Sequence, residues 1–140
     1  MPGAVGWHPW FRRVLVGSPG DPRPPSTPVE LAFEADRMYV RGPDGVPTGE
    51  LATPGPHPWD DCFTGLHAAP VVRWPGVLAV EIRSGCDHWV VYDEPVEGIC
   101  VEPQTAPPDF PTIAPAIVIP GTPLRAMMEW HWWPIPTEDR

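Results

Sequence analysis

Proline is the residue that most constrains how this chain can fold. The 140 residues include 24 prolines and 13 glycines, and the prolines are spread along the chain between short apolar runs. A proline fixes one backbone dihedral and donates no backbone hydrogen bond, so it interrupts helices and favours turns. The apolar share of 42%, with eight tryptophans, argues against a disordered chain. We therefore expect many short strands joined by stiff turns.

Several apolar runs have the alternation or composition of β-strands. Residues 29–35 and 37–42 are predicted as a hairpin, and residues 77–84 alternate between apolar and polar in the same way. The runs 88–94 and 98–103 are rich in β-branched and aromatic residues, which is typical of central strands. The remaining expected strands are 116–121 and 124–133, and the expected connections are 17–28, 42–58 and 103–115. Together these predict an all-β chain, a two-layer β-sandwich forming one domain over residues 1–140.

The net charge limits the kinds of partner that we expect the chain to bind, and the cysteines indicate its cellular compartment. Nine arginines, no lysine and 18 acidic residues give a net charge of −9, so we expect no binding to nucleic acid. We expect no membrane association, because no apolar run approaches the roughly 20 residues that a spanning helix needs. Cys62, Cys86 and Cys100 lack the spacing of a disulfide or zinc framework. Three sparse cysteines fit reduced thiols, so we expect a cytoplasmic protein.

Four segments contain residues suited to acid–base chemistry or ligand binding: "GWHPWF", "HPWDDCFTG", "DHWVVYDEP" and "ICVEPQTAPPDF". Glu102 ends an apolar strand, where it is either exposed or partly buried; burial would make it a usable proton acceptor near neutral pH. His8 can exchange a proton near neutrality, but beside Trp7 and Trp10 it can also be a packed ring.

Tryptophan and the polar run 57–67 each allow two interpretations. An indole ring can cover the apolar face of a sugar or simply fill a core. We expect most of the tryptophans in the core, and those beside polar candidates near a pocket: Trp7, Trp10, Trp59 and Trp89. Residues 57–67 contain histidine, aspartate and cysteine without the spacing of a zinc site, so we expect no metal there.

Taken in this order, the four segments resemble the aldose 1-epimerase (galactose mutarotase-like) family. Its members carry a "G-x-H-P-[YW]-F"-like segment, then "D-[DHN]-x-F", then "YxxP" and then "[IL]-C-[VL]-E-P-Q"; here these are "GWHPWF", "WDDCFTG", "VVYDEP" and "ICVEPQT". The resemblance covers nearly the whole chain, including the closing "PG-x-PL". It implies that the chain is the C-terminal half of a β-supersandwich.

The resemblance also implies roles for particular residues. Glu102 would take the proton of the anomeric hydroxyl, and His8 would protonate the ring oxygen so that the pyranose opens. Asp60 would hold sugar hydroxyls, and Gln104 would position Glu102 or the substrate. With Trp7, Trp10 and Trp59 as sugar contacts, these form the expected site, with no metal and no cofactor. The loop 107–115 departs from the family, which often has an Asn after the Phe.

Three functions are compatible with these residues. The first is an isomerase that interconverts the anomers of a hexose or related sugar, active only with the family's N-terminal half supplied. The second is a non-catalytic carbohydrate-binding β-sandwich, and the third is a proline-rich structural domain. For a half-sandwich we further expect self-association through exposed strand edges.

Overall fold

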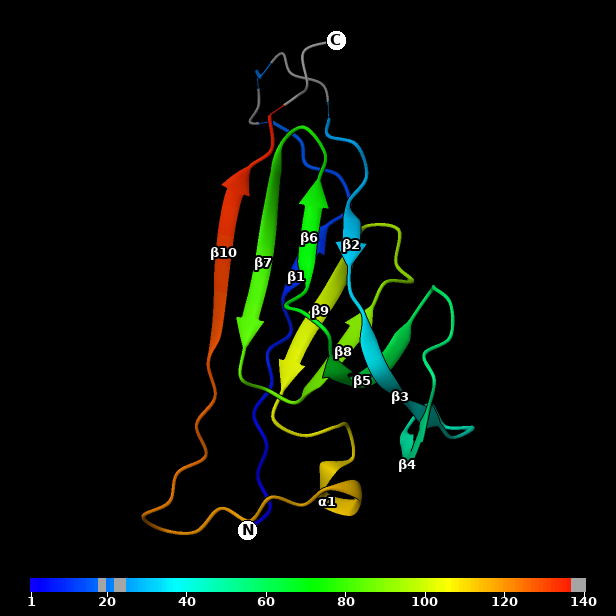
Figure 1. The fold of residues 1–140 in the computed structure, drawn as a ribbon, viewed down its shortest axis with the longest axis vertical. Coiled ribbons are helices and arrows are strands. Elements are labelled where there is room, and N and C mark those ends of the chain that lie inside the picture. Colours follow the sequence, from blue (N-terminus) through cyan, green and yellow to red (C-terminus); the bar gives the residue numbers. More distant parts are fainter. Residues whose placement is uncertain (18–19, 22–24, 137–140) are drawn as a thin grey trace.

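The chain folds into two antiparallel β-sheets packed face to face. The computed structural model describes residues 1–17, 20–21 and 25–136 (Figure 1). The larger sheet contains, in spatial order, β1 (Trp10–Arg12), β9 (Gly98–Gln104), β8 (His88–Tyr92), β5 (Asp60–Leu66), β3 (Ala35–Arg41) and β4 (Pro47–Ala52). The smaller contains β10 (Met128–Pro134), β7 (Leu78–Ser84), β6 (Val71–Trp74) and β2 (Glu30–Ala32). With α1 (Phe110–Ile113) as the one helix of the described residues, the predicted all-β sandwich is confirmed.

The hydrophobic core lies between the two sheets. Val72 and Ile82 of the smaller sheet are fully buried against Ile99 and Val101 of β9. Burying an aliphatic side chain of this size contributes about 1.5–3 kcal/mol relative to leaving it exposed. Successive residues of a strand face opposite sides of the sheet. Since Ile99 and Val101 face the core, the intervening side chains of β9 face away from it.

Three predicted strands are confirmed, and one is shifted. The runs 77–84, 88–94 and 98–103 correspond to β7, β8 and β9, and both β8 and β9 are internal strands as expected. The run 124–133 corresponds to β10, which begins four residues later at Met128. These segments are the ones with the clearest alternation or the densest β-branched composition.

The predicted hairpin between residues 29–35 and 37–42 is wrong. Strand β2 pairs with β6 in the smaller sheet, whereas β3 pairs with β4 and β5 in the larger one. The chain changes sheets at Phe33, whose ring packs against Trp59 and Phe63 in a second core cluster. Packing of this half-buried ring against the second core cluster therefore accompanies the separation of two strands that are adjacent in sequence.

The predicted strand 116–121 is also wrong. In this segment only Ile117 and Ile119 form isolated bridges, and most of its side chains are exposed. Flanking prolines remove the backbone donors that a ladder needs. Strand β4 lies inside the expected connection 42–58, and α1 inside 103–115. The expected connection 17–28 lies partly outside the described residues, at 18–19 and 22–24.

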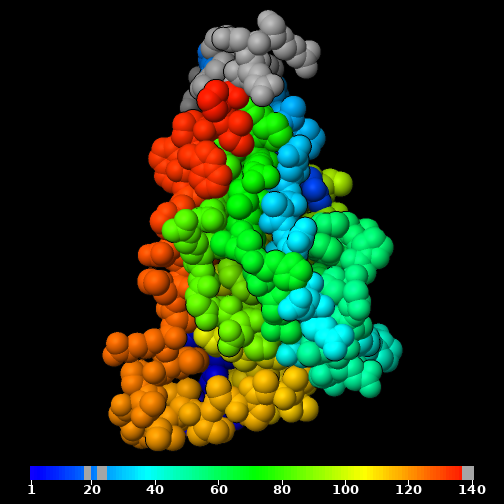
Figure 2. Space-filling model, viewed as in Figure 1, coloured from blue at the N-terminus to red at the C-terminus, as the bar shows by residue number. Residues whose placement is uncertain are grey.

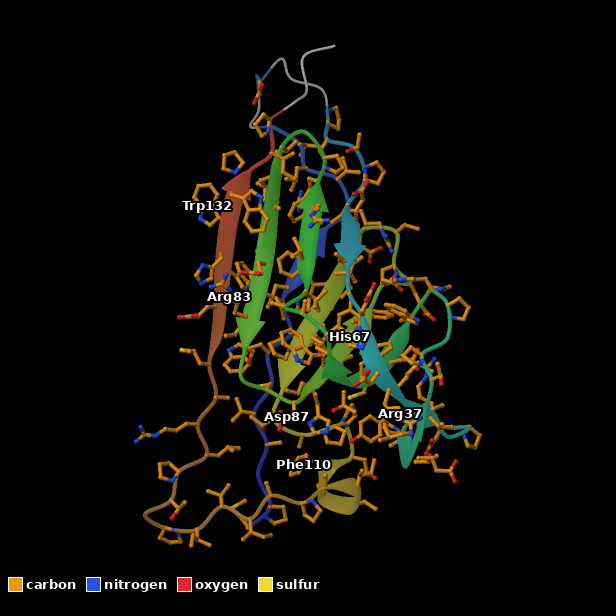
Figure 3. All side chains as sticks on the ribbon, in the orientation of Figure 1. Arg37, His67, Arg83, Asp87, Phe110 and Trp132 are labelled. Carbon is orange, nitrogen blue, oxygen red and sulfur yellow. The ribbon has the colours of Figure 1, made fainter. Side chains whose placement is uncertain are left out.

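Strand β10 forms one margin of the molecule (Figure 2). Its tryptophans are exposed to a large extent. Trp130 and Trp132 pair with Ile82 and Val80, whose side chains are buried in the core, so they lie on the inner face of the sheet. Trp130 contacts Phe11 with ring centroids 5.2 Å apart, but Trp132 remains 71% exposed (Figure 3). The short β1 at the edge of the larger sheet leaves part of this inner face uncovered. In the described part of the chain, no helix is long and apolar enough to cross a membrane.

Candidate active site

The N-terminal segment lies against β9 and brings His8 to Glu102. Backbone contacts fix this arrangement: Trp7 N donates to Pro103 O at 3.2 Å, and Trp10 pairs with Cys100 at the start of β1. The two predicted catalytic residues then meet directly, with His8 Nε2 3.2 Å from Glu102 Oε1. The imidazole is mostly exposed, whereas Glu102 is only 5% exposed. The pair therefore joins a buried carboxylate to a solvent-accessible ring.

Neighbouring side chains hold both members of the pair. Gln104 Nε2 donates a hydrogen bond of 3.3 Å to Glu102 Oε2, which leaves Oε1 facing His8. The Trp10 ring stacks on His8 with centroids 5.9 Å apart and planes inclined by 25°. The Sγ of Cys100 lies 3.6 Å from His8 Nδ1. Gln104 and Trp10, two of the predicted binding residues, thus lie beside the predicted acid and base.

A glycine makes this close approach possible. Gly6 forms an isolated bridge with Gln104, and a Cβ at Gly6 would lie only 2.9 Å from Gln104 Cγ. Any larger residue at this position would displace the amide that supports Glu102. The glycine of "GWHPWF" is therefore explained by packing against β9.

Burial changes the acidity of the carboxylate. Desolvation raises the pKa of Glu102 above that of an ordinary glutamate, and the charge of Asp60 acts in the same direction. Contacts with His8, Gln104 and Cys100 oppose the rise in the Glu102 pKa without cancelling it. A glutamate with a raised pKa is a stronger base once ionised.

Burial also keeps the neighbouring thiol protonated: it raises the pKa of Cys100 to about 12. This cysteine is therefore a neutral thiol at neutral pH in the protein as described.

Asp60 lies on the same face of the larger sheet. In the strand register, Asp60 is opposite Tyr92, Tyr92 is opposite Cys100, and Cys100 is opposite Trp10. Opposite residues of paired strands share a face, so these four side chains form a row across the sheet. Arg41 forms an ion pair with Asp60 at 3.1 Å and another with Asp61 at 3.0 Å.

A cavity of about 460 Å³ adjoins this row. It includes Asp60 and extends to Val90, the residue opposite Glu102 in the register. Its volume is within the range of small-molecule sites. It is lined by Arg41, Gly45, Val46, Pro47, Asp60, Asp61, Cys62, Val90, Pro108 and Asp109. A larger cavity of about 820 Å³ lies between the ends of β5, β7 and β8 and is lined in part by Trp89, but it contains none of the predicted site residues.

Trp59 does not line the cavity beside Asp60. It is 8% exposed, packs with Phe63 in the second core cluster, and donates its indole N–H to Gly55 O at 2.8 Å. His57 stacks on it with centroids 3.6 Å apart. Trp59 instead lines a separate cavity of about 280 Å³ with Phe33 and His67, and its role as a sugar contact stays a prediction. Trp7 is half-buried and remains a predicted contact.

Two further polar residues, His88 and Tyr39, lie on the same face of the larger sheet as Glu102 and were not predicted from the sequence. His88 is opposite Gln104 in the register, and its Nε2 lies 3.1 Å from the hydroxyl oxygen of Tyr39. Burial lowers the pKa of His88, so this ring is neutral at neutral pH. The alternation of "HWVVY" places His88, Val90 and Tyr92 on one face, but only the pairing of β8 with β9 shows that this face is the one carrying Glu102.

Comparison with known proteins agrees with this fold. No protein-family model and no curated protein matches the chain. Among solved structures, it is similar to a protein from Escherichia coli K12 assigned as an aldose 1-epimerase, with a TM-score of 0.68, 15% identity, and coverage of 96% of this chain and 52% of that one. It is also similar to a galactose mutarotase-like protein from Clostridium acetobutylicum, with a TM-score of 0.73, 15% identity, and coverage of 96% and 48%.

These similarities define the class of fold. The chain has the β-sandwich fold of the aldose 1-epimerase and galactose mutarotase-like structures, as the sequence resemblance implied. It spans about half the length of the two solved structures that it matches.

Proposed function

We propose that this chain is the C-terminal portion of an aldose 1-epimerase-like protein and binds a hexose or related sugar on the polar face of its larger sheet. In the complete assembly, the site would interconvert the sugar's anomers by acid–base ring opening. The observation that carries the proposal is the 3.2 Å contact between His8 Nε2 and the buried Glu102 Oε1. The order of the four sequence segments and the shared fold support it.

The closeness of the two groups suits the reaction. Glu102 takes the proton of the anomeric hydroxyl while His8 gives a proton to the ring oxygen, and the bond between the ring oxygen and the anomeric carbon breaks. Both oxygens are attached to that carbon, so the base and the acid must converge on one small region. Rotation about the C1–C2 bond of the open aldehyde, followed by the reverse transfers, gives the other anomer. The two proton transfers balance, so the scheme calls for no cofactor.

Other residues of the same face would bind and orient the sugar. Asp60 accepts hydrogen bonds from sugar hydroxyls at the neighbouring cavity, and Arg41 holds that carboxylate in place through its 3.1 Å ion pair. Gln104 keeps one oxygen of Glu102 occupied, so that the other faces the substrate. Trp10, which stacks on His8 and is about half exposed, offers its ring to the apolar side of the sugar.

Measurement of mutarotation by polarimetry, with glucose and galactose, tests the proposal. We expect weak or no acceleration by this chain alone, because it spans half of the related structures, and a rate above that of buffer once the complementary half is supplied. Glu102→Gln should lower that rate by about 100-fold or more, since general-base catalysis contributes about 10²–10⁴. Glu129→Gln, at an exposed carboxylate of β10, is the matched control and should leave the rate unchanged. A complemented protein whose rate is the same with Glu102→Gln would contradict the mechanism.

Non-catalytic carbohydrate binding is the second candidate, and the half-length match favours it for the isolated chain. Titration with millimolar hexose, followed by tryptophan fluorescence, distinguishes it. Binding that persists in the Glu102→Gln variant, without mutarotation even after complementation, would support binding alone.

Self-association and location remain proposals. The outer edge of β10 has no partner strand in the described residues, and the inner face beside it exposes Trp132. We propose that a second copy of the chain covers this margin. A cytoplasmic location stays a prediction from the reduced cysteines.

A further inference from the structure

His8, Cys100 and Glu102 form a cluster of three different metal-binding groups. Each can offer one ligand atom, and these atoms all lie within 4.8 Å of one another. We propose that this His8–Cys100–Glu102 cluster is a binding site for a divalent ion of the zinc type. The inference differs from the sequence expectation of no metal, because it depends on His8, which is far from Cys100 and Glu102 in the chain and meets them through the pairing of β1 with β9.

The ligand chemistry fits zinc better than calcium or magnesium. Imidazole nitrogen, cysteine sulfur and carboxylate oxygen are the three ligand types that Zn²⁺ takes in proteins, whereas the hard cations prefer oxygen alone. Binding of the ion displaces the proton of the Cys100 thiol, which is released to solvent. The resulting thiolate and the Glu102 carboxylate then balance the two charges of the ion, which favours its burial. Three protein ligands with one open position are typical of zinc sites that bind water or a substrate.

The spacing reaches that of a zinc site once the imidazole turns. With zinc–ligand distances of about 2.0–2.3 Å, the ligand atoms of a tetrahedral site lie roughly 3.3–3.6 Å apart. The two short contacts run to opposite nitrogens of one imidazole: Cys100 Sγ lies 3.6 Å from His8 Nδ1, and Glu102 Oε1 lies 3.2 Å from His8 Nε2. With one ligand atom taken from each residue, the three atoms lie within 4.8 Å of one another, so the ring must turn before a single nitrogen can share an ion with both. Because the His8 ring is mostly exposed, it can rotate to direct one nitrogen at an ion held between the sulfur and the oxygen.

The surroundings are those of a supported site with an entry path. Cys100 and Glu102 are buried two residues apart on one face of β9, so the strand fixes their separation. Gln104 holds Glu102 Oε2 and leaves Oε1, the oxygen that faces His8, to act as the ligand, as an outer-shell residue does for a carboxylate ligand. The exposed side of His8 gives the ion access from solvent and room for a fourth ligand.

Metal binding and acid–base catalysis would exclude each other at this site. An ion coordinated by His8 and Glu102 occupies the lone pairs that the proposed ring opening needs for its proton transfers. Zinc is therefore expected to inhibit the proposed isomerase by competing with the sugar. The metal site itself does not depend on that function, because it follows from the cluster alone.

Cobalt(II), used as a spectroscopic substitute for zinc, tests the site. We expect the full chain, reduced with a phosphine and kept anaerobic, to bind one Co²⁺ with a thiolate-to-cobalt charge-transfer band in the near ultraviolet. Equimolar Zn²⁺ should abolish this band by displacement. Absence of a thiolate band at saturating Co²⁺ would overturn the proposal.

Variants assign the ligands. Cys100→Ser should remove the charge-transfer band and weaken Zn²⁺ binding by about 10-fold or more. Cys86→Ser, which removes a half-buried thiol outside the cluster, should leave both unchanged. His8→Ala is a second test at an exposed position where the fold is expected to tolerate the change, and it should weaken binding to a similar extent. A band that survives Cys100→Ser, or disappears with Cys86→Ser, would show that the ligands are elsewhere.

These measurements are independent of mutarotation. A protein that binds cobalt through Cys100 but never accelerates mutarotation would refute only the proposed isomerase. One that accelerates mutarotation without a thiolate band would refute only the metal site.

Discussion

The Nε2 atom of His8 lies 3.2 Å from Oε1 of Glu102, although one residue is near the start of the chain and the other is in its last third. The contact joins an exposed imidazole to a carboxylate that is almost fully buried. The protein thus places a solvent-accessible imidazole against a carboxylate that burial has made more basic.

The raised pKa of Glu102 predicts how stability changes with pH. The folded state disfavours the ionised carboxylate, so the stabilising contribution of its protonated form is complete below the ordinary glutamate pKa of 4.5 and is lost as the pH rises through the raised value. Glu102→Gln cannot ionise, so we expect it to gain stability relative to the native protein over that pH range. Urea denaturation between pH 4 and 8, roughly spanning the change, measures this. A constant difference between the two proteins would show that Glu102 is not strained by burial.

Trp10→Ala should weaken sugar binding more than it weakens the fold. The ring is 48% exposed, so little core packing is lost, but its stacking on His8 disappears. With aromatic contacts contributing about 0.5–1.5 kcal/mol, we expect a 2- to 10-fold rise in the sugar Kd, roughly, by calorimetry. Trp132→Ala, on β10, is the matched control and should leave the Kd unchanged. Equal effects of the two variants would place the sugar elsewhere.

Phe63→Ala should be strongly destabilising. Phe63 is fully buried and its ring contacts Phe33 and Trp59, where the chain passes from one sheet to the other. Truncation of a buried phenylalanine costs about 3–5 kcal/mol. Ile117→Ala, at an exposed position, is expected to change the free energy of unfolding by no more than about 0.5 kcal/mol. Similar denaturation midpoints for both variants would mean that the second core cluster contributes little.

Trp132→Glu should reduce self-association. It places a charge on the uncovered inner face of β10 in a chain whose net charge is already −9. Light scattering coupled to size-exclusion chromatography should show the native chain as dimer or larger and the variant shifted toward monomer. A native chain that is monomeric throughout the micromolar range would contradict the proposed second copy.

The sequence predicted the strands whose residues clearly favour β-structure. It did not predict which strands pair with one another. "VLAVEIRS" and "GICVEP" are recognisable because alternation or β-branched residues suit no other structure. The sheet to which β2 and β3 belong cannot be deduced from their own residues, because the packing of Phe33 against Trp59 and Phe63 accompanies their separation.

The candidate site was likewise predictable only in part. Motif order suggested His8, Glu102, Asp60 and Gln104, and the structure gathers them on one face of the larger sheet. The contributions of Cys100 and His88 depend on which strands lie side by side, which is a non-local property. The role of Trp59 as a sugar contact stays a prediction, because a polar neighbour in sequence does not say which way the ring points.

The first residues of the chain are bonded on two sides by their backbone. Gly3 N donates to Ala116 O and Val118 N to Met1 O, while Thr105 N donates to Val5 O. The position of the imidazole is thus determined by main-chain bonds rather than by the side chains that precede it. Substitutions among residues 1–5 should leave the contact between His8 and Glu102 intact. Deleting those residues would remove the backbone partners of Thr105, Ala116 and Val118 and leave the bonds of Trp7 and Trp10 to β9 to hold the imidazole.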